Sequence, residues 1–165
     1  MSQLARYIHR LPIWIISIFF LVGCNQPTHG LPFDPNIEGL TLVKLATGDD
    51  AGEAINQLHG KRINIVKGFV AHYKAGHDKA IIWGSEAATE EVAKSQLVVM
   101  IHKMKHNRRS PFHNYRTLNM NDHKVIAFDG MGRVHYLFRN NKWLYWITAD
   151  AKRIDKIFEQ VCKPL

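Results

Sequence analysis

The sequence predicts an α+β fold, with a largely antiparallel sheet of about six strands and three helices. Several stretches alternate apolar with polar residues, and they come in pairs separated by short turns, as β-hairpins do. Three other stretches repeat apolar residues at positions i, i+3, i+4 and i+7, which indicates one buried helix face. Because hairpins surround separate helices, an antiparallel sheet is favoured over a parallel one.

The first strand and the first helix are expected within residues 40–60. Leu40 to Ala46 reads as a strand, and Asp50 is expected to cap the helix that follows. Gly60 is well placed to end this helix. Its apolar stripe consists of Ala51, Ala54, Ile55 and Leu58.

A hairpin and a long helix come next. Alternation over residues 62–74 predicts a long strand with a bulge at Gly68, and residues 79–84 return antiparallel to it. The second helix begins around Ser85 or Thr89 and reaches about Lys105. Its predicted buried stripe is Val92, Ala93, Leu97, Met100, Ile101 and Met104. Val98 and Val99 widen its apolar surface.

A three-stranded meander and a last helix complete the chain. The strands are predicted over 123–128, 133–139 and 142–148, with turns at 129–132 and at Asn140-Asn141. The final helix is predicted from Ala151 to Cys162 after an Asp150 cap, and Pro164 ends it. Its apolar stripe is Ile154, Ile157, Phe158 and Val161.

Both faces of this meander are predicted to be apolar. A turn at Asn140-Asn141 would place Phe138 opposite Trp143 and leave one face wholly apolar. The opposite face, which carries His135 and Trp146, is also too apolar to stand fully in water. We therefore expect a helix over part of that face, or a ligand groove.

The N-terminal segment has the features of an export signal. Arg6, His9 and Arg10 form a basic region without acidic residues, and an apolar run from Leu11 to Val22 follows. That run is shorter than the roughly 20 residues of a bilayer-spanning helix. It leads into Leu21-Val22-Gly23-Cys24, which resembles the lipobox of bacterial lipoproteins. An ordinary secretory signal or an uncleaved anchor is the alternative.

The resemblance implies cleavage before Cys24, a diacylglyceryl group on its sulfur and, usually, acylation of its new α-amine. Residues 1–23 would then be the signal peptide, 24–36 a lipidated, proline-rich tether, and 37–165 a single domain. The resemblance places this domain outside the cytoplasm, in the bacterial cell envelope. Asn25, where an Asp would signal inner-membrane retention in many enteric bacteria, favours the outer membrane. Removing the signal takes two of the 22 Lys and Arg residues and none of the 14 acidic ones, which leaves +6.

A basic segment without acidic residues, His102 to Arg116, is the best candidate for binding an anion or a partner. Its cations are Lys103, Lys105, Arg108, Arg109 and Arg116, interleaved with Phe112 and Tyr115. Export makes nucleic acid an unsuitable partner, so lipid headgroups, lipopolysaccharide phosphates or an acidic envelope protein are the available anions. A solvated loop after a helix is the competing interpretation.

Other chemistry is weakly indicated. His102 and His106 share a helical face, but the surrounding cations and the lack of an adjacent carboxylate argue against a metal site. Asp129 near His135 offers a weak catalytic alternative, although turn chemistry also explains that aspartate. We expect a non-enzymatic binding or assembly module with no cofactor beyond the lipid on Cys24. The alternative is an enzyme acting on an envelope polymer.

Overall fold

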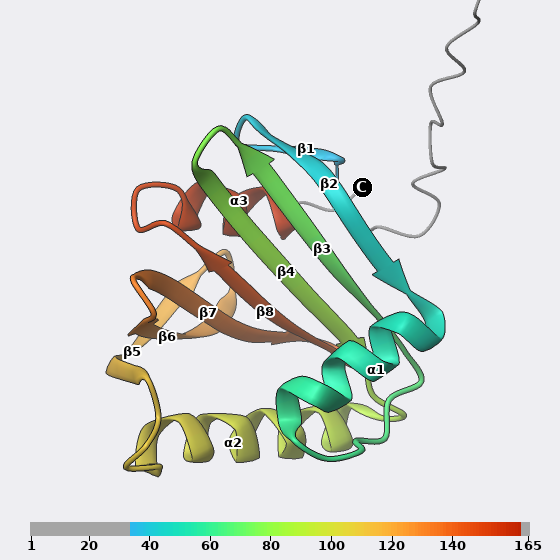
Figure 1. The fold of residues 1–165 in the computed structure, drawn as a ribbon. Coiled ribbons are helices and arrows are strands. Elements are labelled where there is room, and N and C mark those ends of the chain that lie inside the picture. Colours follow the sequence, from blue (N-terminus) through green and yellow to red (C-terminus); the bar gives the residue numbers. More distant parts are fainter. Residues whose placement is uncertain (1–33, 163–165) are drawn as a thin grey trace, which may run out of the picture.

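The computed structural model describes residues 34–162, so the expectations for the signal peptide, the lipobox and most of the tether lie outside the described residues. The elements are β1 (Asn36–Ile37), β2 (Leu40–Thr47), α1 (Gly48–His59), β3 (Lys67–Ala75), β4 (Asp78–Glu86), α2 (Glu90–His106), β5 (Phe112–Met120), β6 (His123–Gly130), β7 (Arg133–Asn140), β8 (Trp143–Ala149) and α3 (Ile154–Val161). The strands form one antiparallel sheet in the order β1-β2-β3-β4-β8-β7-β6-β5 (Figure 1). The α+β class and the three helices are confirmed, but the described sheet has eight strands and not about six. None of the helices in residues 34–162 is long and apolar enough to cross a membrane.

The two strands that the sequence analysis missed lie at the edges of the sheet. β5 pairs with β6 through a two-residue turn in which Asn121 and Asp122 both have positive φ, 47° and 62°. β1 pairs with β2 at the other edge, and the Leu42 amide donates to the Pro35 carbonyl at 2.9 Å. Pro35 and Asn36, which the sequence analysis assigned to the tether, therefore hydrogen-bond or pair with β2.

The first helix begins before its predicted cap. Thr47 occupies the N-cap position of α1, and Asp50 lies in the first turn, where its charge favours the positive helix end. Gly60 ends the helix as predicted, with a φ of 63° that glycine adopts readily.

The strand predicted over 62–74 starts only at Lys67. Residues 62–66 instead form a connection whose backbone is held by side chains of α1 and α2. The Ile63 amide donates to Asn56 Oδ1 at 2.8 Å, and Gln96 Nε2 donates to the Asn64 carbonyl at 3.0 Å. Gly68 is not a bulge, since it pairs in register with Ser85. A Cβ there would lie 2.7 Å from Ile55 Cδ1, so glycine permits close packing of α1 on the sheet.

The meander register differs from the prediction by two residues. The structure pairs Phe138 with Tyr145 and Asn140 with Trp143, so the turn consists of Asn141 and Lys142. Asn141 adopts the positive φ, 51°, while Asn140 stays in β7. An even shift leaves every side chain on its predicted face, because side chains alternate with a period of two.

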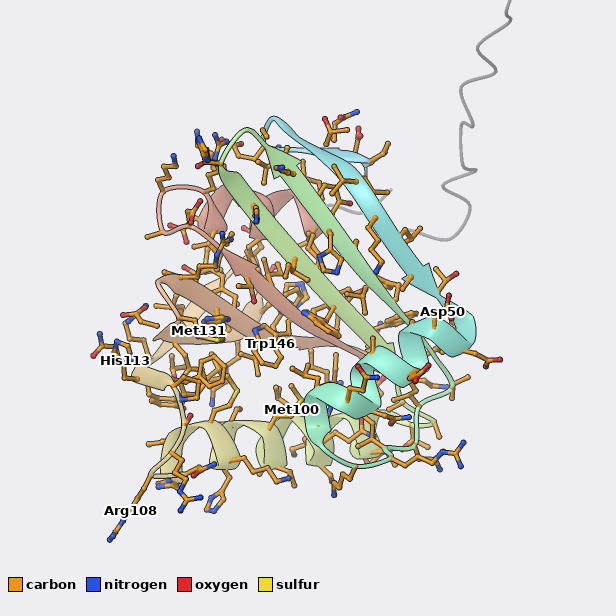
Figure 2. All side chains as sticks on the ribbon, viewed as in Figure 1. Asp50, Met100, Arg108, His113, Met131 and Trp146 are labelled. Carbon is orange, nitrogen blue, oxygen red and sulfur yellow. The ribbon has the colours of Figure 1, made fainter. Side chains whose placement is uncertain are left out.

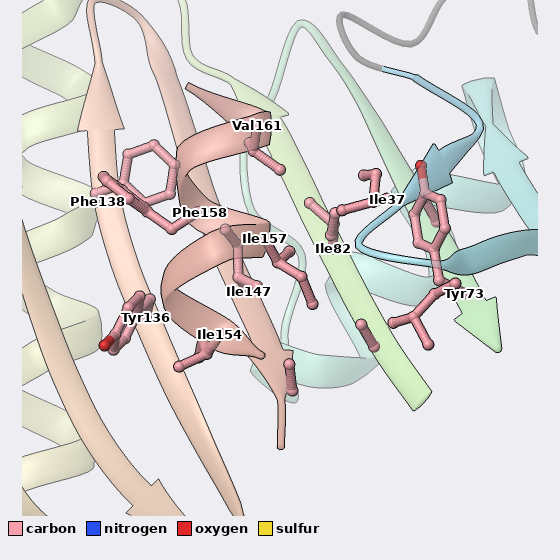
Figure 3. Close-up of a cluster of buried hydrophobic side chains, with 14 of the residues drawn as sticks. Ile37, Tyr73, Ile82, Tyr136, Phe138, Ile147, Ile154, Ile157, Phe158 and Val161 are labelled. Carbon is pink, nitrogen blue, oxygen red and sulfur yellow. The ribbon is translucent and has the colours of Figure 1, made fainter. Parts of the chain in front are cut away.

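The main core lies between α3 and one face of the sheet, as Figure 3 shows. All four stripe residues of α3 are buried. The helix starts at Ile154 and not at Ala151, because residues 151–153 form a turn in which Arg153 and Ile154 both donate to the Asp150 carbonyl. The strand residues of this core are Ile37, Leu40, Phe69, Ala71, Tyr73, Ala80, Ile82, Val125, Ala127, Tyr136, Phe138, Ile147 and Ala149.

The opposite face carries α1 and α2 (Figure 1). Met104, Met100 and Leu97 of α2 pack over Leu137 and its neighbours in β6, so this helix covers part of the face, as expected. Part of the apolar surface of α2 is exposed, and this includes Val92 of the predicted buried stripe, which is 38% exposed. Val98 and Val99 are 59% and 49% exposed, because the helix contacts the sheet along a single stripe.

Candidate functional site

An open groove of about 750 Å³ lies between α1, α2 and the sheet. We call it the α1–α2 groove. Its floor is formed by side chains of β4, β8 and β7. These floor residues are Ile81, Trp83, Leu144, Trp146, Thr148 and His135. The sequence analysis expected a covering helix or a ligand groove on this face, and the structure has α2 over part of it and an open groove beside that helix.

The walls of the groove are also largely apolar. Leu58 and Ile63 belong to the α1 side, and Val99 and Met100 to the α2 side. Figure 2 labels Met100 on α2 and Trp146 on β8, two of the residues that line the groove. Apolar walls with a few polar groups are typical of small-molecule sites, whose volumes run from about 300 to 1,000 Å³.

His135 anchors one end of the floor through a hydrogen-bond network. It is 1% exposed, and its Nδ1 lies 3.0 Å from Thr148 Oγ1 and 3.2 Å from Trp146 Nε1. An indole nitrogen can only donate, so Nδ1 accepts and the ring proton lies on Nε2. Nε2 then donates to the Gly130 carbonyl at 3.0 Å. Burial lowers the pKa of His135, so the ring is neutral and holds Trp146 in place.

Positive charge surrounds the groove. Four of its lining residues, which we call the groove cations, are Lys61, Arg62, Lys103 and Arg109. None of the described residues that line the groove is Asp or Glu. Within residues 34–162 the groove cations form no ion pair. The groove therefore combines an apolar interior with uncompensated positive charge.

The structure divides the predicted basic segment. Lys103 and Arg109 reach the groove, whereas Lys105 lies over the Tyr115 ring at 4.3 Å from its centroid. Arg108 extends away from the body of the molecule (Figure 2). Arg116 is committed to Asp129 on β6, with Nη2 to Oδ1 at 2.8 Å and Nη1 to Oδ2 at 3.1 Å.

The weak catalytic pair does not come together. Phe128 and His135 pair across β6 and β7 on the groove face, so Asp129, the next residue, points to the opposite face. Hydrogen bonds from Arg116 and Asn114 hold the pKa of Asp129 down to about 2. The carboxylate is thus an ion-pair partner, separated from His135 by the sheet.

The histidine pair on α2 is close but lacks further ligands. The ring centroids of His102 and His106 lie 4.7 Å apart. Nowhere in the part of the chain that the structure describes do three His, Cys, Asp or Glu side chains gather as a metal site would require.

Sequence reasoning missed half of the groove. Arg62 was assigned to a strand and Trp83 to a hairpin, without a link to the basic segment, and Lys61 was given no role. The local signal was present, since Gly60-Lys61-Arg62 follows a helix end and leaves both cations in a connection. Their approach to Lys103 depends on the topology, which no local pattern encodes.

The chain was compared with known proteins. No protein-family model, no curated protein and no solved structure matches it.

Proposed function

We propose that this protein is a membrane-anchored lipoprotein of the bacterial envelope that acts as a non-enzymatic binding module. The α1–α2 groove is the observation that carries the proposal, because it is open, largely apolar and of a size suited to a ligand. The lipobox-like sequence ending in Cys24 supports the membrane anchor.

The groove favours binding over the enzymatic alternative. Its buried histidine has both ring nitrogens engaged in hydrogen bonds, and the nearest carboxylate in the sequence lies on the other face of the sheet. A general base must be within hydrogen-bond reach of the group from which it takes a proton. His135 is instead a positioning residue for the aromatic floor.

Site-specific photocrosslinking in living cells tests the binding function. A photoreactive amino acid at Val99 faces the groove, whereas the same residue at Val98 is exposed outside it and serves as the matched control. We expect an adduct from position 99 that position 98 does not give. Identical adducts from both positions, or no adduct from position 99, would contradict a groove function.

The anchor is tested separately by Cys24→Ser. We expect the variant to remain unprocessed and to lose its lipid, measured by mass spectrometry of membrane and soluble fractions. A variant that is still lipidated and cleaved normally would refute the lipoprotein assignment.

A further inference from the structure

We infer that the α1–α2 groove binds an amphiphile with one acyl chain and an anionic headgroup, drawn from the envelope membrane. The inference rests on the proposed binding function and names the class of ligand. The apolar lining of the groove is complementary to the acyl chain, and the groove cations are complementary to the anionic headgroup.

The acyl chain matches the floor and walls. Trp83 and Trp146 provide two large aromatic surfaces, and Val99 and Leu58 remain 49% and 41% exposed beside them. Apolar side chains left in water at the entrance of a concave site gain from covering by a ligand. A volume of about 750 Å³ suits one chain with its headgroup.

The headgroup matches the groove cations. Two of them, Lys61 and Arg62, come from the α1–β3 connection, and Lys103 and Arg109 come from α2 and the segment after it. Because no carboxylate among the described residues lines the groove, their charge is not neutralised by those residues. Phosphate or carboxylate oxygens accept charge-assisted hydrogen bonds from guanidinium and ammonium groups, which are stronger than neutral ones. An uncharged amphiphile would forgo these bonds.

Photolabelling of the full-length protein in phosphatidylcholine vesicles tests this ligand class. The probe is lysophosphatidylglycerol with a diazirine on its acyl chain, and labelled peptides are located by mass spectrometry. Unlabelled lysophosphatidylglycerol and monoacylglycerol of the same chain length are titrated as competitors over the same range of mole fractions. We expect labelling of groove residues, and the charged competitor to act at about tenfold lower concentration.

Variants separate charge from shape. In Lys103→Gln combined with Arg109→Gln, the advantage of the charged competitor should fall to about threefold because Lys61 and Arg62 remain, while Arg108→Gln, outside the groove, should leave it unchanged. Val99→Trp should abolish labelling by filling the groove, whereas Val98→Trp should not.

The two proposals fail differently. Equal competition by monoacylglycerol, with labelling still lost in Val99→Trp, overturns the anionic ligand and leaves the groove as a binding site. Labelling outside the groove that Val99→Trp does not affect overturns the ligand class as well. Failure of the in-cell crosslink from position 99 would overturn the binding function itself.

Discussion

Replacing His135 by Phe removes the hydrogen-bond network of the groove floor and keeps a ring of similar shape. The edge-to-face contact with Phe112, 4.9 Å between centroids, can persist. Three hydrogen bonds are lost, to Gly130, Thr148 and Trp146. Each contributes about 0.5–1.5 kcal/mol net, and water in the groove can replace part of two of them, so we expect a loss of about 1.5–3 kcal/mol.

Urea unfolding followed by circular dichroism measures this loss. The matched control is His123→Phe, since the ring of His123 packs against Phe138 and Phe158 at 5.7 and 6.3 Å without a hydrogen bond. That control should change the free energy of unfolding by less than about 0.5 kcal/mol. Equal losses in both variants, or no loss in His135→Phe, would refute the role assigned to the network.

The pH dependence gives the same test an independent readout. The pKa of His135 is lowered mainly by burial. As the pH falls below about 6.5, the usual pKa of histidine, this side chain is therefore protonated in the unfolded chain at a higher pH than in the folded protein. The stability linked to His135 is therefore complete above about pH 6.5 and decreases as the pH falls below it. His135→Phe should flatten this decrease without abolishing it, because burial also lowers the pKa of His72. An unchanged slope would contradict a neutral, buried His135.

Three further predictions concern sites outside the groove. Phe158→Ala should cost about 3–5 kcal/mol in urea unfolding, because this fully buried ring packs edge-to-face on Phe138 at 4.9 Å. In Arg116→Met, the pKa of Asp129 should rise from about 2 toward 3.8 in an NMR titration. The wild-type protein should lose the stability linked to this ion pair as the pH falls from 3.8 to about 2, and the variant should not show this loss. Burial raises the pKa of the Cys162 thiol to about 12, so maleimide should react with it slowly in the native state and rapidly in urea. The modification is measured on the peptide that contains Cys162. An unchanged Asp129 titration or fast native labelling of Cys162 would contradict these assignments.

Apolar repeats of period two and 3.6 predicted which side of each strand or helix is buried better than they predicted which residues pair across strands. The stripe of α3 and the apolar face that it covers follow from alternation alone, and they survive a register error of two residues. The error arose because either asparagine of Asn140-Asn141 can adopt a positive φ, and the choice of Asn141 depends on the pairing of the whole hairpin.

β5 shows why an edge strand is harder to predict. Most of its residues are exposed, so no apolar alternation marks it, and only pairing with β6 defines it as a strand. The turn residues Asn121-Asp122 before His123 were the available signal. Missing this strand also hid the ion pair that removes Arg116 from the basic segment.

The groove itself follows from how much sheet two helices can cover. Eight strands at about 4.8 Å spacing span roughly 34 Å, and the two helices contact separate parts of that width. The main contacts of α1 are with β2 and β3, and those of α2 with β5, β7 and β8, so β4 lies between them. Trp83 of β4 and Trp146 of β8 pair directly, at the border between this strip and the part of the sheet under α2. Because the strip is apolar but not covered by the chain, an apolar ligand there would take the place of a third helix.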